Sequence, residues 1–311
     1  MTLNDRKLGS LWGAIIGDAL GVPVEFSSRK ERGEDPVVGM RGYGQYNQPP
    51  GTWSDDSSML LCTVEALSEP EYSAKQLAGM FLNWRQYGYM TPHGDCFDIG
   101  IATSKALSRF ENGTPPEESG GTEEGDNGNG SLMRILPVAL RYTDAPIEDM
   151  LFIAHRISAI THRHPRSQMA CGLYCIMAKA LLNGMTPPQS YRYMVKQGSQ
   201  FYNTAPFAAE YPHFTRILTN DISKLPEADI ASKGYVINTL EASLWCLLTS
   251  NSFEETVLKA VNLGGDTDTT GCVAGGLAGL YYGMASIQQA WIDAIVRKDD
   301  IGEILEKFIG V

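Results

Sequence analysis

The most informative residues of this chain are Gly264-Gly265-Asp266-Thr267-Asp268-Thr269-Thr270-Gly271, which lead directly into an apolar segment over residues 271–282. Within that segment a glycine recurs every four positions, at Gly271, Gly275 and Gly279. In a helix these glycines would form one smooth stripe, although each costs about 1 kcal/mol relative to alanine. We therefore expect a central helix whose stripe packs closely against another helix and whose rigid N-terminal end carries Asp266 and Asp268. The alternative, a flexible glycine-rich segment, fits the intervening large apolar residues less well.

A second acidic stretch of the same kind lies far earlier in the chain, at Gly51-Thr52-Trp53-Ser54-Asp55-Asp56-Ser57-Ser58-Met59. Like the first, it combines two carboxylates, small hydroxyl side chains and a glycine-containing turn ahead of an apolar segment. Either stretch alone also fits ordinary capping of a helix N-terminus. Together their aspartates would repel one another unless two Mg²⁺ or Mn²⁺ ions cancelled the charge, and all-oxygen ligands suit these hard cations rather than zinc. The pair of stretches therefore predicts a two-metal hydrolase.

Size and composition are those of an ordinary globular protein. The 311 residues are 43% hydrophobic and 20% charged, and no Pro/Ser-rich linker divides them, so we expect a single domain over residues 1–311. A net charge of −11 argues against binding to nucleic acid or to an anionic membrane through bulk charge. No signal peptide is visible, and the longest apolar segment, 271–284, is too short and glycine-rich for a membrane span. The six scattered cysteines follow no zinc or disulfide pattern, so a cytoplasmic location is expected.

Apolar residues recur at helical spacing along almost the whole chain, and clear alternating strand patterns are missing. This pattern predicts an all-α protein of about ten or more helices. The expected helices cover residues 11–20, 59–67, 78–84, 101–110, 132–142, 147–161, 167–182, 188–197, 236–248, 253–261, 271–282 and 287–298. Two long loops are expected over Ser27–Pro50 and Asn112–Gly130. The second has the composition of a disordered segment, but long loops in compact enzymes are also often binding loops.

Further motifs occur in order around the two acidic stretches: Gly17-Asp18-Ala19-Leu20-Gly21-Val22-Pro23-Val24-Glu25, Asp98-Ile99-Gly100, Gly128-Asn129-Gly130-Ser131-Leu132-Met133-Arg134 and Thr161-His162. In this order, and spread over nearly the whole chain, the motifs resemble those of the ADP-ribosylglycohydrolase family. This group contains dinitrogenase reductase-activating glycohydrolase and the ADP-ribosylarginine hydrolases. The resemblance implies a compact, orthogonal multi-helix fold around a binuclear Mg²⁺ or Mn²⁺ site. It also implies hydrolysis of an N- or O-glycosidic bond to ADP-ribose.

The same resemblance assigns roles to individual residues. The metal ligands would be Ser54, Asp55, Asp56, Asp266, Asp268 and Thr269. The family often has threonine where this chain has Ser54, and both side chains offer a hydroxyl oxygen. The carboxylate that stabilises the cation-like sugar or takes a proton from water is sought among Asp56, Asp98 and Glu25, and the sequence does not order these three. Glu25 matches a glutamate on a movable segment near the metals, so it is a candidate gate. Without the resemblance, Glu25 and Asp98 would each be interpreted as solvated surface acids.

The resemblance also implies substrate contacts from Gly128, Asn129, Gly130, Ser131 and His162. The first three are predicted to open the helix over 132–142, where backbone N–H groups would bind phosphate without a cationic side chain. Phosphate would be repelled by the nearby acids, which are expected to point away: Glu123, Glu124 and Asp126. His162 is expected to hydrogen-bond or stack rather than to bind metal, because it shares no helix face with His164.

These inferences predict a cytoplasmic, metal-dependent ADP-ribosylarginine hydrolase that acts on an ADP-ribosylated protein and reverses mono-ADP-ribosylation. Arginine is preferred because the Pro-Pro-Gly-Thr-Trp-Ser-Asp-Asp form of the motif, at residues 49–56, resembles that branch most. One alternative is hydrolysis of serine-linked, O-acetylated or free ADP-ribose derivatives. Another is an immunity protein that also binds and blocks a cognate ADP-ribosyltransferase toxin. A third, a non-enzymatic relative such as a jellyfish lens crystallin, is disfavoured by the four intact aspartates.

Overall fold

The computed structural model describes residues 1–310 and confirms the predicted all-α class, since β structure among these residues is limited to isolated bridges. The α-helices are α1 (Leu3–Gly21), α2 (Arg29–Glu34), α3 (Asp55–Leu67), α4 (Ala74–Tyr87), α5 (Ile101–Glu111), α6 (Leu136–Arg141), α7 (Ile147–Ala159), α8 (Pro165–Leu182), α9 (Pro187–Tyr202), α10 (Thr215–Thr219), α11 (Val236–Leu248), α12 (Phe253–Asn262), α13 (Thr267–Tyr282), α14 (Gln289–Ala294) and α15 (Lys298–Ile309). Short 3-10 helices include η2 (Gly44–Tyr46), η3 (Pro116–Glu118) and η4 (Glu124–Asp126). Within residues 1–310 no helix combines the length and apolar character needed to cross a membrane.

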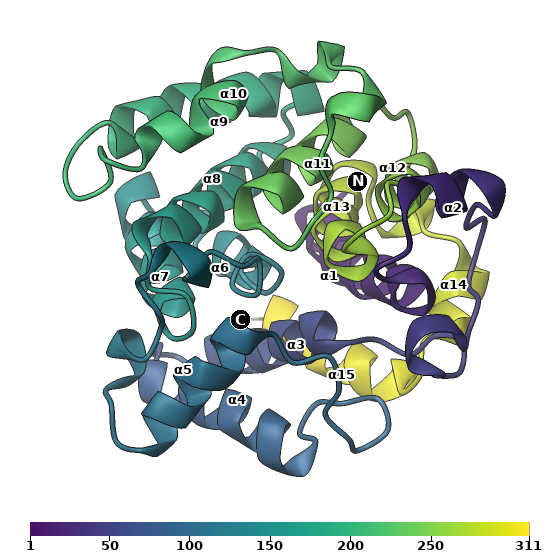
Figure 1. Cartoon of the computed structure of the whole chain (residues 1–311), viewed down its shortest axis with the longest axis horizontal. Coiled ribbons are helices and arrows are strands. Elements are labelled where there is room, and N and C mark those ends of the chain that lie inside the picture. The colour runs from purple at the N-terminus through teal and green to yellow at the C-terminus, as the bar shows by residue number, and fades with distance from the viewer. Residues whose placement is uncertain (311) are drawn as a thin grey trace.

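Helices α1 and α13 pack side by side at the centre of the fold and are buried along most of their length (Figure 1). The glycine stripe of α13 faces a matching stripe of α1, formed by Gly9, Gly13, Gly17 and Gly21. A Cβ atom on Gly13 or on Gly275 would lie under 3.0 Å from the carbonyl oxygen of the opposite glycine, closer than real Cβ atoms approach. The predicted central helix is therefore confirmed, and the sequence of α1 carries the same four-residue spacing, which was overlooked.

Several predicted helices differ from the structure in their boundaries; α1, for example, begins at Leu3 rather than at residue 11. Two of the predicted helices are shortened or broken. The helix expected over 132–142 is the short α6, which begins at Leu136 because Pro137 occupies its first turn, where proline is favoured. Residues 130–134 form turns instead, so the Gly128–Gly130 segment does not open a helix. The helix expected over 287–298 ends at Ala294, because Ile295 is extended, and Arg297, with a φ of 57°, is the N-cap of the unpredicted α15.

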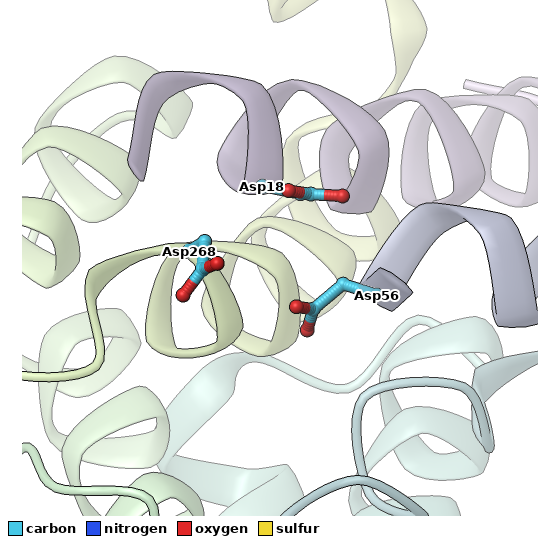
Figure 2. A group of neighbouring side chains, drawn as sticks. All are labelled: Asp18, Asp56 and Asp268. Atoms are coloured by element: carbon cyan, nitrogen blue, oxygen red, sulfur yellow. The ribbon is translucent and has the colours of Figure 1, made fainter. Parts of the chain in front are cut away.

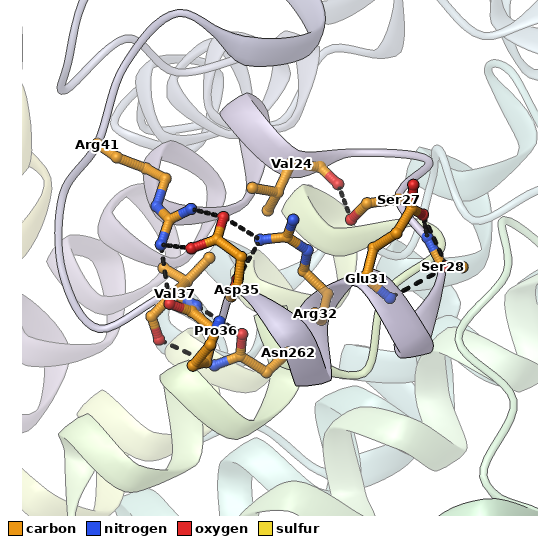
Figure 3. Close-up of polar contacts among 10 residues, drawn as sticks. All are labelled: Val24, Ser27, Ser28, Glu31, Arg32, Asp35, Pro36, Val37, Arg41 and Asn262. Atoms are coloured by element: carbon orange, nitrogen blue, oxygen red, sulfur yellow. Dashed lines mark hydrogen bonds and ion pairs between the residues drawn. The ribbon is translucent and has the colours of Figure 1, made fainter.

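The segment after Glu25, predicted as a long loop, contains the helix α2 (Figure 3). Ser28 and Glu31 form a capping box that starts this helix. Downstream, the Asn262 side chain accepts a hydrogen bond from the Val37 amide (2.8 Å) and donates one to the Val37 carbonyl oxygen (2.9 Å). These contacts tie the segment to α12, so any movement of Glu25 would have to occur close to Glu25 itself.

The glycine- and glutamate-rich segment Asn112–Gly130 is folded onto the turn between α7 and α8. Its Gly120 amide donates to the Ala159 carbonyl oxygen (3.0 Å), and the Arg163 amide donates to the Gly121 carbonyl oxygen (3.0 Å). Two short 3-10 helices, η3 and η4, occupy part of it. Of the two interpretations of its composition, the structure therefore favours an anchored loop over a disordered one.

Candidate active site

Asp18, near the end of α1, fixes the start of α3. Its carboxylate accepts hydrogen bonds from the Ser54 amide (3.0 and 3.1 Å), the Ser57 amide (3.0 Å) and the Ser57 hydroxyl (2.5 Å). A carboxylate suits this position because the first amides of a helix have no intrahelical partner. Burial raises the pKa of Asp18 to about 6, although these hydrogen bonds act in the opposite direction. Asp18 was not among the predicted site residues, and the structure places it where it orients the first acidic stretch.

Asp56 joins the two acidic stretches. Its Oδ2 accepts hydrogen bonds from the Ser54 hydroxyl (3.0 Å) and from the Thr269 hydroxyl on α13 (3.3 Å). The Ser54 hydroxyl in turn accepts from the Asp56 amide (3.2 Å), which makes Ser54 the N-cap of α3. The first turns of α3 and α13, which are far apart in the sequence, therefore meet at one carboxylate.

The aspartates and Glu25 form two overlapping groups of carboxylates. Oxygen atoms of Asp18, Asp56 and Asp268 lie within 4.8 Å of one another, and so do oxygen atoms of Glu25, Asp266 and Asp268. Figure 2 shows the first group, in which α1, α3 and α13 each supply one aspartate. Asp268 belongs to both groups. Asp55, a predicted metal ligand, lies outside both groups and lines the neighbouring cavity instead.

The chemistry of this cluster fits hard divalent cations. Within residues 1–310, three of its buried oxygens have no hydrogen-bond partner: Asp56 Oδ1, Asp266 Oδ1 and Asp268 Oδ2. The ion pairs formed among the same residues involve none of the clustered acids. Burial, followed by the charges of neighbouring acids, raises the pKa of Asp56 and of Asp268 well above the ordinary value. Buried oxygens left without a donor or a cationic side chain are costly, and Mg²⁺ or Mn²⁺ would satisfy them.

The turn at Gly264 and Gly265 presents Asp266 to this cluster. Both glycines adopt a positive φ, 73° and 76°, which glycine accepts without strain. The Gly265 amide donates to the Ser27 carbonyl oxygen (2.7 Å), and the Phe26 amide donates to the Gly265 carbonyl oxygen (2.7 Å). The turn that carries Asp266 is therefore bound directly to the backbone that follows Glu25.

Glu25 and Asp98, two of the predicted catalytic carboxylates, contact the same phenol. Tyr46 Oη lies 2.6 Å from Glu25 Oε2 and 2.6 Å from Asp98 Oδ1. One hydroxyl proton serves only one of these contacts, so the other requires a proton on a carboxyl group. Burial, with the charge of Asp98 next, raises the pKa of Glu25 to about 9, which makes Glu25 the protonated partner at neutral pH. Asp98 has a φ of 57°, a conformation that non-glycine residues rarely adopt and that is common at functional sites.

A cavity of about 300 Å³ opens beside the carboxylates. Its wall includes the predicted site residues Glu25, Asp55, Asp98, Gly128, Asn129, Gly130, His162, Asp266 and Thr269. Four other predicted residues are buried and do not line it: Ser54, Asp56, Ser131 and Asp268. Two exposed apolar side chains also contribute to the wall, Phe26 and Ile101, which are 63% and 75% exposed.

The segment Gly128–Gly130 forms one side of this cavity. The Asn129 side chain does not point to a substrate but donates to Asp266 Oδ2 (3.0 Å) and to the Thr239 hydroxyl (2.9 Å), so it orients a carboxylate of the cluster. Within residues 1–310, the amides of Gly128, Gly130 and Ser131 donate no hydrogen bond. Backbone amides without a partner in a turn suit an anion such as a diphosphate.

His162 is buried beside this wall and lines the cavity. Its Nδ1 lies 2.8 Å from the Thr161 hydroxyl, whose oxygen accepts a hydrogen bond from Arg134 Nη2 (2.6 Å). The Thr161 hydroxyl therefore donates its own proton to His162 Nδ1, so the ring proton of the neutral His162 lies on Nε2. Burial, then the charge of Arg134, lowers the pKa of His162 to about 3, so the ring is neutral. The Ser131 hydroxyl accepts from the Ser158 hydroxyl (2.9 Å), so this side chain is held inside the fold and not at the cavity.

Sequence reasoning missed Asp18, Tyr46 and Phe26. Asp18 had a signal of its own, because a single carboxylate inside an apolar helical segment has to find buried donors. Tyr46 and Phe26 had none, since an aromatic residue in a glycine-rich segment packs into a core at least as often as it lines a site.

Comparisons with known proteins agree with this geometry. The chain matches the family model described as ADP-ribosylglycohydrolase over residues 1–311. It is 29% identical over 308 residues to ADP-ribosylarginine hydrolase Tri1 of Serratia proteamaculans, a match that covers 97% of this chain and 78% of that protein. It is 28% identical over 305 residues to ADP-ribosyl-[dinitrogen reductase] glycohydrolase of Rhodospirillum rubrum, covering 96% and 92% of the two chains.

More distant and structural similarities point the same way. ADP-ribosylhydrolase ARH3 of Gallus gallus is 23% identical over 328 residues, covering 92% of this chain and 88% of that protein. Among solved structures, a chain of an ADP-ribosylglycohydrolase-related protein complex superposes with a TM-score of 0.82 and 31% identity. That superposition covers 99% of this chain and 98% of the other.

Proposed function

The chain belongs to the ADP-ribosylglycohydrolase family, and from that premise we propose that it is a divalent-metal-dependent hydrolase that removes ADP-ribose from modified arginine side chains of proteins. One observation carries the proposal: buried carboxylate oxygens without partners lie beside a cavity whose other side offers free backbone amides. Such a cavity suits a ligand with a cation-binding ribose end and an anionic diphosphate. The arginine linkage is supported by relatives that are themselves named ADP-ribosylarginine hydrolases.

Two Mg²⁺ or Mn²⁺ ions would be held by Asp56, Asp266 and Asp268, with Asp268 common to both carboxylate groups. The hydroxyls of Ser54 and Thr269, next to Asp56, would complete the set. Asp55, on the cavity wall, stays a proposed ligand. When bound, such ions polarise the oxygens that coordinate them and hold them in place for reaction. Asp18 and Asn129 keep the carboxylates oriented through their hydrogen bonds to α3 and to Asp266.

Asp98 is the carboxylate that we assign to the reacting sugar. Glu25 carries the proton that its contact with Tyr46 requires, so the Tyr46 hydroxyl donates its own proton to Asp98, which lies on the cavity wall. There it would stabilise positive charge on the ribose and accept a proton from the attacking water. Glu25 stays the proposed gate. Its carboxyl group lies with Asp266 and Asp268 in the second carboxylate group. Asp56 is less suited to proton transfer, since it is buried and does not line the cavity.

Phe26 supports an arginine-linked substrate in particular. Its ring is 63% exposed, lines the cavity and directly follows Glu25 in the chain. Its φ of 62° is unusual for a residue other than glycine. A guanidinium is a planar cation that binds aromatic faces, so Phe26 offers the leaving group a cation–π contact.

Serine-linked and O-acetyl ADP-ribose remain the second candidate substrates, since a relative whose name specifies no arginine linkage, ADP-ribosylhydrolase ARH3, also aligns with most of this chain. The discriminating experiment uses proteins that carry ADP-ribose on arginine, serine or glutamate, each treated with the enzyme in the presence and absence of Mg²⁺ or Mn²⁺. We expect release of ADP-ribose from the arginine-linked protein only when a divalent ion is present. Preferential release from the serine-linked protein would replace arginine as the substrate, and release that is unaffected by chelation would reject the metal site.

A further inference from the structure

Arg166, in the first turn of α8, is buried and fully engaged, with a side chain that is only 2% exposed. Its two terminal nitrogens contact the Glu124 carboxylate at 2.5 and 3.1 Å. Nε and Nη2 contact Glu210 Oε2 at 2.8 and 2.7 Å, and Nη1 donates to the Tyr235 hydroxyl (3.1 Å). A guanidinium carries five N–H donors in a fixed plane, so this one side chain joins three separate segments to α8.

Two of these three segments form the wall of the cavity. Glu124 immediately precedes Gly125, and Tyr235 immediately follows Gly234, and both glycines line the cavity. The two segments also pair with each other, because the Asn129 amide donates to the Gly234 carbonyl oxygen (3.1 Å) in an isolated bridge. Arg166 binds Glu124 in one of these segments and Tyr235 in the other, and each of these residues is next to a glycine that lines the cavity.

Arg166 also pairs with one of the acidic side chains around Gly125 that would repel a diphosphate. Three acids, Glu123, Glu124 and Asp126, precede the amides that would receive a diphosphate. The hydrogen bonds from Arg166 hold the pKa of Glu124 below its ordinary value and keep this carboxylate on α8. The Asp126 carboxylate folds back onto the Glu123 amide (3.0 Å). The pair with Arg166 therefore draws one of the repelling charges away from the amides.

We propose that Arg166 is a positioning residue for the substrate: through Glu124 and Tyr235 it holds the cavity wall at residues 125–130 in the shape that accepts the diphosphate. It acts on binding rather than on the chemical step, because no contact links it to the carboxylate cluster directly. The inference rests on the proposed function, since it requires ADP-ribose to bind at this wall.

The test uses Glu124→Ala in the full-length protein, since the Glu124 side chain is 76% exposed and its loss leaves the core intact. We expect the affinity for ADP-ribose, measured by calorimetry with Mn²⁺ present, to fall by about 10-fold, as for loss of a charge-assisted hydrogen bond. The KM for ADP-ribosylated protein should rise by a similar factor while kcat and Mn²⁺ affinity stay within about twofold, the ordinary scatter for a site not touching the reacting atoms. Glu124→Gln, which keeps one acceptor oxygen, should restore part of the affinity.

Glu117→Ala is the matched control. Glu117 lies in the same Asn112–Gly130 segment and pairs with an arginine, Arg156, at 2.7 Å, but it does not line the cavity. This variant should bind ADP-ribose as the wild-type protein does. The inference is overturned if Glu124→Ala binds ADP-ribose normally, or if Glu117→Ala loses as much affinity. If the wild-type protein itself binds no ADP-ribose, the proposed function fails, and the role of Arg166 fails with it.

Discussion

At the scale of single residues, the site is defined by buried carboxylate oxygens that no neighbouring group hydrogen-bonds. Asp56, Asp266 and Asp268 each keep one buried oxygen without a partner, whereas Asp18 has its oxygens occupied by the start of α3. This difference separates carboxylates that would bind cations from one that orients a helix. The sequence indicated Asp56, Asp266 and Asp268 but not the orienting role of Asp18, because that role depends on hydrogen bonds across the fold.

The first prediction concerns Phe26 as a contact for the leaving guanidinium. Phe26→Leu keeps an apolar side chain but removes the aromatic face, so kcat/KM for ADP-ribosylarginine should fall by about 3- to 30-fold, as expected for one cation–π contact. The affinity for free ADP-ribose, which has no guanidinium, should not change when measured by calorimetry.

Tyr43→Leu provides the control for Phe26. Tyr43 is also an exposed aromatic residue with a positive φ, at 60% exposure and 66°, but it does not line the cavity. Its replacement should leave kcat/KM unchanged. An equal loss of ADP-ribose affinity in Phe26→Leu would show that the ring contacts ADP-ribose rather than the leaving group.

At the scale of elements, the pairing of α1 with α13 brings the acidic residues together. The glycine stripes allow these helices to approach closely, and Asp18 and Asp268 lie on the facing pair (Figure 2). The sequence predicted α13 because its apolar residues keep helical spacing between the glycines. The start of α6 and the existence of α2 were not predicted, because their signals are local: Pro137 in the first turn of α6 and the Ser28 capping box of α2. Apolar periodicity does not register such signals. Helix α15 was not predicted either, and it is amphipathic, with Ile301, Leu305 and Phe308 on its buried face.

The second prediction tests this helix pair. Gly275→Ala places a Cβ atom against the Gly13 carbonyl oxygen, and neither atom can move without a shift of its helix backbone, so we expect a loss of about 1–3 kcal/mol in the free energy of unfolding. Urea denaturation followed by circular dichroism measures this loss.

Gly302→Ala is the control for the helix pair. Gly302 lies inside α15 and an added Cβ atom would have no atom within 4 Å, so the substitution should stabilise the protein by up to about 1 kcal/mol. Stabilisation by Gly275→Ala as well would show that the two helices are not held at close approach.

At the scale of the whole molecule, the buried acids make stability depend on pH. Glu25 has an ordinary pKa of 4.5 and a folded pKa of about 9, and the pKa values of Asp55, Asp56 and Asp268 are raised as well. These groups hold protons in the folded protein that the unfolded chain has already released. Their contribution to stability is complete below the unfolded pKa and is lost as the pH rises towards the folded pKa. The buried His155 and His162 act in the opposite direction, but only below their unfolded pKa of 6.5.

The third prediction follows for the protein in a chelator. Its melting temperature should fall between pH 7 and pH 9, where the histidines no longer contribute. Addition of Mg²⁺ should raise the melting temperature more at pH 9 than at pH 7, because ions that displace protons bind better when fewer protons compete. Scanning calorimetry at both pH values measures the two effects, and a melting temperature that rises with pH in the chelator would contradict the acid cluster.

The whole fold was predictable as a class and as a family, since helical periodicity and the order of the motifs are both properties of the sequence. Most of the acids of the site could be predicted from the sequence, but their positions relative to one another could not. Asp55 lies apart from the two carboxylate groups, Asn129 faces Asp266, and the wall at Gly128 depends on Arg166, which no nearby motif indicated. Each of these features arises from contacts between segments that are distant in the chain. The single domain over residues 1–311 stays a prediction.

The divalent-metal site proposed for this protein is built from two distant acidic stretches, and Asp268 is the residue that both carboxylate groups share. The most direct measurement is a titration of Mn²⁺ followed by electron paramagnetic resonance, with the wild-type protein, Asp268→Asn and the exposed Asp149→Asn of α7. The wild-type protein and Asp149→Asn should each bind two ions. Asp268→Asn should weaken both sites by roughly 100-fold or more, since loss of even an outer-shell partner costs 10- to 100-fold. Binding of two Mn²⁺ ions by Asp268→Asn with wild-type affinity would contradict the site.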